Sequence, residues 1–228
     1  MNTSEVFRKE IKYPISVAEF SQLNQRLKFL VQPDPYSGDA GYCVRSLYFD
    51  SVKDHDLFDT LDGKMEKRKI RLRFYPPKID SILLEYKCKS GSDGVKRSIK
   101  ISKEDALSMM WADYSFLLDY QGPLAHKLYA RLMTGGYHPK VIVEYNRMAY
   151  VYPVSNTRLT FDSAVRASFV INSFFDETPG MIPAMAPDMG VLEVKYDYFL
   201  VGLLKEVLEP VNALAKANSK YAMSRFIF

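Results

Sequence analysis

Hydrophobic and polar residues alternate along several short stretches of this chain, a pattern typical of β-strands that bury one face. In residues 67–75 the cations Lys69, Arg71 and Arg73 alternate with large apolar residues. The same kind of pattern predicts further strands at 5–15, 43–50, 81–89, 94–101, 140–152, 157–162 and 191–196. We therefore expect about eight strands.

Apolar residues at helical spacing predict four or five helices, with candidates at 16–31, after Ser102, at 123–134 and at 199–217. Ser16 and Ser102 each stand three residues before an acidic residue, which is capping-box spacing. The chain lacks a regular strand–helix alternation and a glycine-rich phosphate loop, so a parallel nucleotide-binding sheet is disfavoured. We expect one α+β domain over residues 1–228, a closed antiparallel β-barrel that forms a tunnel, with helices packed outside.

Charge follows the strands in a repeated motif, Glu-x-Lys, at 10–12, 85–87 and 193–195. Side chains two apart on a strand share a face, so each motif places a carboxylate beside an ammonium group. Cations also crowd one face at Lys69/Arg71/Arg73, Lys87/Lys89 and Lys96/Lys100. Like charges side by side are destabilising unless an anion neutralises them. The pattern favours a polyanion and a divalent ion held by Glu10, Glu85 or Glu193, with Glu144 as a further candidate; an open sheet with solvated ion pairs is the simpler alternative.

Composition adds few constraints. The chain has 228 residues, 47% of them hydrophobic, and a net charge of +4. Cys43 and Cys88 lack metal-ligand spacing and fit reduced thiols. The polar N-terminus and the absence of a 20-residue apolar stretch predict a cytoplasmic protein without an intrinsic membrane segment. The aromatic residues alternate away from the cations, so nucleic-acid binding is the weaker alternative.

Motifs along nearly the whole chain resemble the polyphosphate polymerase domain of the vacuolar transporter chaperone (VTC) complex and its bacterial relatives. This family belongs to the triphosphate tunnel metalloenzyme (CYTH-like) superfamily. The motifs are RKEIKY (8–13), VRSLYFD (44–50), KRKIRLRFY (67–75), LLEYKCKS (83–90), the Lys96 strand, VEYNRMAY (143–150), RLTFD (158–162), LEVKY (192–196) and SKY (219–221). Arg8 stands where the broader superfamily has its first glutamate, which favours the VTC branch.

The resemblance implies an antiparallel β tunnel in which basic residues bind phosphates and Glu193 binds Mn²⁺ or Mg²⁺. It implies the phosphate ligands Lys12, Arg71, Arg73, Lys87, Lys96, Arg147, Arg158 and Lys220, with Lys195 as a further tunnel lysine. The same-face charge pattern adds Lys89 to the substrate-binding residues and Glu10 to the metal ligands. The residues expected to act in catalysis are Arg71, Arg73, Lys87 and Lys195.

The activity that the resemblance implies is transfer of the γ-phosphoryl group of ATP to the end of a polyphosphate chain, with release of ADP. An inorganic triphosphatase or nucleoside triphosphatase on the same scaffold is one alternative, and a non-catalytic polyphosphate-binding module is another. The sequence has no counterpart of the eukaryotic complex's SPX domain or membrane helices. A membrane protein partner would therefore be a separate chain.

Overall fold

The computed structural model describes residues 8–38, 40–91, 93–212, 215 and 218–227. The chain divides into two compact units, each assembled from three stretches. The first unit comprises 1–43, 145–165 and 185–218, and the second comprises 44–144, 166–184 and 219–228. The described residues form six α-helices and a large antiparallel sheet, so the α+β class is confirmed.

The first unit holds six strands in whole or in part: β1 (Arg8–Ser16), β2 (Gln32–Pro33), the first two residues of β3 (Tyr42–Asp50), β7 (His138–Tyr152), β8 (Thr157–Ser168) and β10 (Met189–Asp197). β7 and β8 continue into the second unit. The helices of the first unit are α1 (Val17–Leu27), α5 (Gly202–Asn212) and the short 3-10 helix η2 (Val154–Asn156). β10 pairs with β1 on one side and with β8 on the other, both antiparallel.

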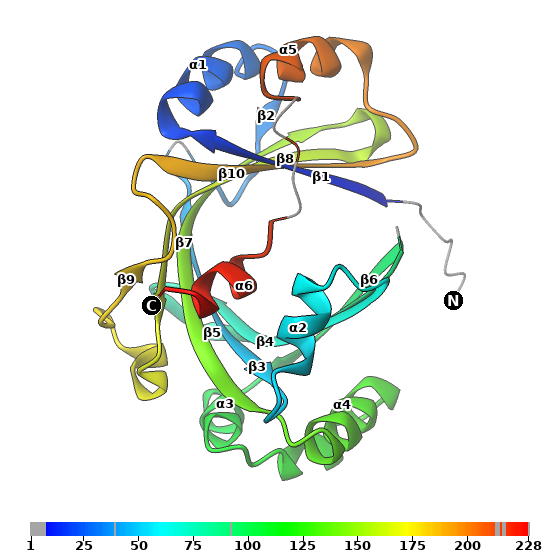
Figure 1. The fold of residues 1–228 in the computed structure, drawn as a ribbon, viewed down its shortest axis with the longest axis vertical. Coiled ribbons are helices and arrows are strands. Elements are labelled where there is room, and N and C mark those ends of the chain that lie inside the picture. Colours follow the sequence, from blue (N-terminus) through cyan, green and yellow to red (C-terminus); the bar gives the residue numbers. More distant parts are fainter. Residues whose placement is uncertain (1–7, 39, 92, 213–214, 216–217, 228) are drawn as a thin grey trace. The chain divides into compact units, whose positions relative to one another are not determined.

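Helices α1 and α5 lie together against one face of β1 and β10, where they bury the apolar side of the sheet (Figure 1). The ring of Phe20 in α1 stacks on Phe161 in β8 with centroids 3.8 Å apart. Ser16 caps α1 through the capping box with Glu19 that the sequence predicts. Pro210 lies inside α5 and does not start a second helix.

The second unit is built on β3 (Tyr42–Asp50), β4 (Glu66–Tyr75), β5 (Lys78–Ser90), β6 (Asp93–Ile101), the short β9 (Ile182–Pro183) and the remaining parts of β7 and β8. Its helices are α2 (His55–Leu61), α3 (Lys103–Met110), α4 (Pro123–Thr134), α6 (Lys220–Arg225) and the 3-10 helices η1 (Ser115–Leu118) and η3 (Ile171–Phe175). The predicted helix at 123–134 matches α4 in both bounds, and Ser102 caps α3 with a capping box.

The core of the second unit lies between the apolar face of β3–β6 and the helices α3 and α4 (Figure 1). Ile70, Leu72 and Phe74, which alternate with the cations of β4, are at most 1% exposed. The apolar side of this strand is therefore fixed by packing, and its cations lie on the opposite face.

The expectation of a closed barrel is wrong. The hydrogen-bonded strand order is β1-β10-β8-β7-β3-β4-β5-β6, with β2 beside β7 and β9 beside β8. Among the described residues, β1 and β6 each pair with a single strand, so the sheet has two ends. Alternation along a strand determines which side chains share a face, but it does not determine whether the terminal strands meet.

No helix among the described residues is both long enough and apolar enough to cross a membrane.

Gly190 at the start of β10 provides a test of packing in the first unit. A Cβ atom at this position would lie 2.5 Å from the ring of Phe161 and 2.9 Å from the carbonyl oxygen of Asp162. We expect Gly190→Ala to lower the free energy of unfolding by about 1–3 kcal/mol, measured by urea denaturation, because the crowded ring and backbone must shift. Gly180→Ala is the matched control, since a Cβ there meets no atom within 4 Å. Equal stability of the two variants would contradict the packing described here.

Candidate functional site

Three lysines occupy directly paired positions on neighbouring strands of the second unit. Lys69 on β4 lies opposite Lys87 on β5, which in turn lies opposite Lys96 on β6. Like charges at directly opposed positions of a sheet repel each other. This row of ammonium groups is therefore a place where an anionic ligand would relieve repulsion.

Glu85 is the carboxylate at the centre of this face. It is 2% exposed and accepts a hydrogen bond of 2.7 Å from Nε of Arg71. Lys96 Nζ lies 2.5 Å from its other oxygen, and Arg73 contributes a longer contact of 3.7 Å. Burial alone would raise the pKa of Glu85, but the charges of Arg71, Arg73 and Lys96 outweigh burial and hold it far below its ordinary value. The Glu85 carboxylate is thus the shared counterion of Arg71, Arg73 and Lys96.

The neighbouring strand β3 orients the two arginines. Arg71 donates a hydrogen bond of 2.8 Å to the Tyr48 hydroxyl and lies over its ring. Arg73 donates to Ser46 Oγ at 3.2 Å. Burial would raise the pKa of Tyr48, but the Arg71 and Arg73 charges dominate and lower it. Tyr48 and Ser46 were missing from the sequence prediction, although VRSLYFD places both on one face of a strand.

Helix α6 brings the closing SKY motif to the same face. Ser219 Oγ accepts a hydrogen bond of 2.8 Å from Lys69 Nζ, and the Tyr221 ring stacks on Tyr48 with centroids 5.0 Å apart. Lys220 is buried, and its charge helps to lower the pKa of Tyr48. The second unit therefore brings together five predicted site residues, namely Arg71, Arg73, Lys87, Lys96 and Lys220. Lys89 is exposed farther along β5, opposite Lys67.

In the first unit the two remaining Glu-x-Lys motifs pair with each other. β1 and β10 run antiparallel, so Lys12 lies opposite Glu193 and Glu10 lies opposite Lys195. Lys12 Nζ lies 3.1 Å from Glu10 and 3.3 Å from Glu193, and Lys195 Nζ lies 2.9 Å from Glu193. Burial would lower the pKa of Lys12, but Glu193 and Glu10 outweigh it and raise this pKa. The four charges form an alternating square.

Glu10 and Glu193 of this square are the two predicted metal ligands. Glu10 and Glu193 both reach the same ammonium group, so their oxygens converge on one point. Mg²⁺ typically takes one or two protein carboxylates and fills its shell with phosphate oxygens and water. Within the described ranges no cluster of three or more His, Cys, Asp or Glu residues could bind a metal. Metal binding by Glu10 and Glu193 stays a prediction.

Arg147 and Arg158 have carboxylate partners that the sequence prediction missed. Asp162 is fully buried and binds Arg147 through two hydrogen bonds of 2.6 and 2.7 Å. Arg158 lies 3.0 Å from Asp34 and opposite Lys195 in the strand register. The motif RLTFD could have revealed Asp162, because residues 158, 160 and 162 share a face of the strand.

Burial would lower the pKa of Arg147, but Tyr145, Asp162 and Glu193 together raise it well above its ordinary value. Glu193, a member of the charged square, is thus one of the charges that favour the protonated form of Arg147.

Glu144, the further carboxylate candidate, belongs to a separate ion-pair network of the second unit. It is 4% exposed and pairs with Arg45 at 2.7 Å and with Arg166 at 2.6 Å. Arg45 also donates to the carbonyl oxygens of Phe174 and Asp176. Both carboxylate oxygens of Glu144 are engaged by arginines, so this residue joins the strands and segments that carry Arg45 and Arg166.

Two solved structures have a fold similar to that of this chain. A candidate adenylate cyclase from Bacillus halodurans has a TM-score of 0.56 at 12% identity, covering 97% of this chain and 100% of that one. A candidate adenylyl cyclase from Hippeastrum, described as having a dominant triphosphatase activity, has a TM-score of 0.59 at 14% identity, covering 96% of this chain and 94% of that one. These two proteins and this chain therefore share a fold.

The family model of the VTC domain matches residues 7–227. The chain therefore belongs to the VTC domain family, as its motifs indicated. No curated protein sequence matches the chain.

The buried carboxylate of Glu85 leads to a prediction about pH. The folded-state pKa of Glu85 lies below its ordinary value of 4.5, so its stabilising contribution is present above pH 4.5 and is lost as pH falls below it. Glu85→Gln removes this contribution and leaves Arg73 buried without its carboxylate. We expect a loss of about 3 kcal/mol at pH 7 and a smaller difference from the wild type at pH 3.5. Urea unfolding at both pH values measures this, and a difference that does not change with pH would contradict it.

Proposed function

We propose that this protein transfers the γ-phosphoryl group of ATP to the end of a polyphosphate chain and releases ADP, in a reaction that requires Mn²⁺ or Mg²⁺. The observation that carries the proposal is the excess of cations around Glu85, with Lys69, Lys87 and Lys96 in register. Membership of the VTC family supports phosphate binding by the cations of this face.

The cations of the second unit are suited to bind phosphates. Arg71 and Arg73 present guanidinium groups, whose fork matches two phosphate oxygens, while Lys87 and Lys96 act as point charges. Tyr48 and Ser46 hold the arginines in place before substrate arrives. Preorganised charges of this kind stabilise a phosphoryl-transfer transition state without reorganising during the reaction. The proposed roles are phosphate binding and charge neutralisation.

Glu193 and Glu10 are the residues that would hold the divalent ion, next to Lys195 and Lys12. A bound divalent ion supplies neutralisation of charge on the phosphate oxygens. In the proposed step, a terminal oxygen of polyphosphate forms a bond to the γ-phosphorus of ATP. The bond between this phosphorus and the β–γ bridging oxygen breaks, and ADP leaves with the electron pair. Arg71, Arg73, Lys87 and Lys195 neutralise the charge that develops on the transferred group.

Hydrolysis is the second candidate, supported by the triphosphatase activity described for the Hippeastrum protein of similar fold. Water would then replace the polyphosphate end as the attacking group, and inorganic phosphate would be released. The same phosphate-binding residues would serve both reactions. The acceptor therefore distinguishes the two candidates.

The first experiment incubates the purified protein with ATP and Mn²⁺ and analyses products on a gel stained for polyphosphate, with free phosphate measured in parallel. We expect ATP-dependent polymer from the wild type. Arg71→Ala should reduce turnover roughly 100-fold, because it removes a preorganised charge from the transition state. Glu85 retains Arg73 and Lys96, so this variant should still fold, as checked by circular dichroism.

Arg26→Ala is the matched control for the loss of one arginine. Arg26 is exposed in the last turn of α1, and its removal should leave turnover unchanged. Free phosphate without polymer would favour hydrolysis. The absence of both products would leave a binding module and contradict the enzyme proposal.

The second experiment tests the carboxylates of the charged square. Glu193→Gln keeps the size of the side chain but removes the charge that would bind the metal. We expect the Mn²⁺ concentration for half-maximal activity to rise at least roughly tenfold, as for the loss of a metal-site interaction. Glu206→Gln, at an exposed position of α5, is the control. An unchanged Mn²⁺ requirement in Glu193→Gln would reject this metal site.

A further inference from the structure

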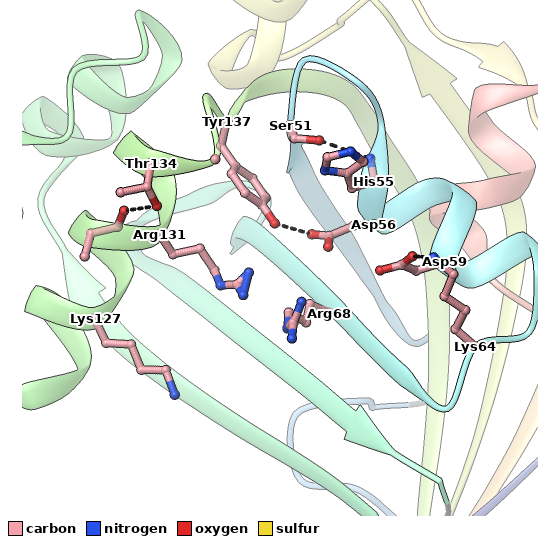
Figure 2. Close-up of a pocket in the computed structure, with 12 residues that line it drawn as sticks. Ser51, His55, Asp56, Asp59, Lys64, Arg68, Lys127, Arg131, Thr134 and Tyr137 are labelled. Carbon is pink, nitrogen blue, oxygen red and sulfur yellow. Dashed lines mark hydrogen bonds and ion pairs between the residues drawn. The ribbon is translucent and has the colours of Figure 1, made fainter.

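A second group of cations lies on the opposite face of β4 from Arg71. Arg68 is three residues from Arg71, so alternation places it on the face of Ile70 and Leu72. Together with Lys127 and Arg131 of α4, it lines a pocket of about 540 Å³. Figure 2 shows the side chains of Arg131 and Arg68 extending towards one another from α4 and β4. No residue of this pocket belongs to the phosphate-binding face described above.

The carboxylates near the pocket leave part of its positive charge unneutralised. Asp59 binds Lys64 at 2.6 Å, and Glu66 contacts Arg68 at 3.1 Å. Within the described part of the chain, neither Lys127 nor Arg131 forms an ion pair with a carboxylate. Lys127 and Arg131 are four residues apart, so they share one side of α4. The pocket therefore has an excess of positive charge on one wall.

The third carboxylate, Asp56, offsets this excess only in part. It is 2% exposed and accepts a hydrogen bond of 3.0 Å from the Tyr137 hydroxyl. Burial, with a contribution from the neighbouring Asp50, raises the pKa of Asp56 to about 7 even though Arg131 and Arg68 lower it. A substantial fraction of this carboxyl is therefore neutral at pH 7.

We propose that this pocket binds an inorganic phosphate chain at a site separate from the face that carries Arg71. Two guanidinium groups and an ammonium group match the oxygens of adjacent phosphates. The volume is in the range of sites for small ligands. Of the two aromatic residues that line it, Tyr137 is buried and His55 is exposed, so one imidazole ring is the only aromatic surface among its lining residues for stacking a nucleobase. This second site does not depend on the proposed catalytic activity.

Titration calorimetry with pyrophosphate tests the proposal on the full chain in metal-free buffer. We expect Arg131→Ala to weaken binding at the pocket at least tenfold, the effect of losing a charge-assisted hydrogen bond. Arg71→Ala should retain pocket binding, and the double variant Arg71→Ala/Arg131→Ala should lose it. Arg26→Ala controls for the loss of one positive charge elsewhere. If Arg131→Ala does not fold by circular dichroism, Lys127→Ala at the exposed edge of the pocket replaces it.

The isotherms separate the outcomes. Identical isotherms of the wild type and Arg131→Ala would overturn the second site, as would an equal loss in Arg26→Ala. A parallel titration with ADP distinguishes the source of the phosphates, and binding of ADP without pyrophosphate would contradict an inorganic ligand. Because each comparison is a difference caused by Arg131, it can be interpreted whether or not the protein turns over ATP.

Discussion

The buried carboxylate of Glu85 is the interaction on which the charged face of the second unit depends. A guanidinium group as buried as that of Arg73 would be strongly destabilising without a counterion. Glu85 also holds Arg71 and Lys96, so one acid organises three bases that would otherwise repel each other. The face is consequently preorganised and still positively charged. These two properties are what a phosphate-binding surface needs before its ligand arrives.

The same three-residue motif serves different purposes in different strand environments. In β1 and β10 the two Glu-x-Lys segments pair antiparallel, so every charge faces its opposite. In β5 the neighbours are β4 and β6, which carry Lys69 and Lys96 opposite Lys87. The first arrangement is locally neutral and presents two convergent carboxylates, whereas the second has an excess of cations. Pairing partners, rather than the motif itself, decide whether a segment is locally neutral or carries an excess of positive charge.

Periodicity and capping patterns were sufficient to predict most helices and strands, because these patterns depend on residues that are close together in the sequence. The capping boxes of Ser16 and Ser102 and the bounds of α4 are such cases. The closed barrel was predicted wrongly, since pairing between strands that are distant in sequence leaves no local signal. Tyr48, Ser46 and Asp162 were missed for a related reason. Each contacts an arginine on a neighbouring strand. The prediction considered the cations and did not consider the polar residues that orient them. The assignments to individual phosphates and to the metal stay predictions.

Strand β4 contributes cations to two separate groups, one on each face of the sheet. Alternation sends Lys69, Arg71 and Arg73 to one face, while the apolar residues between them anchor the core. Near the start of β4, Arg68 occupies a position on the same face as the buried Ile70 and Leu72. Helix α4 contributes Lys127 and Arg131 to the pocket that Arg68 also lines. Each group also has its own counter-charge, because Glu85 pairs with Arg71 and Glu66 with Arg68. An anion bound on one face therefore does not occupy the cations of the other.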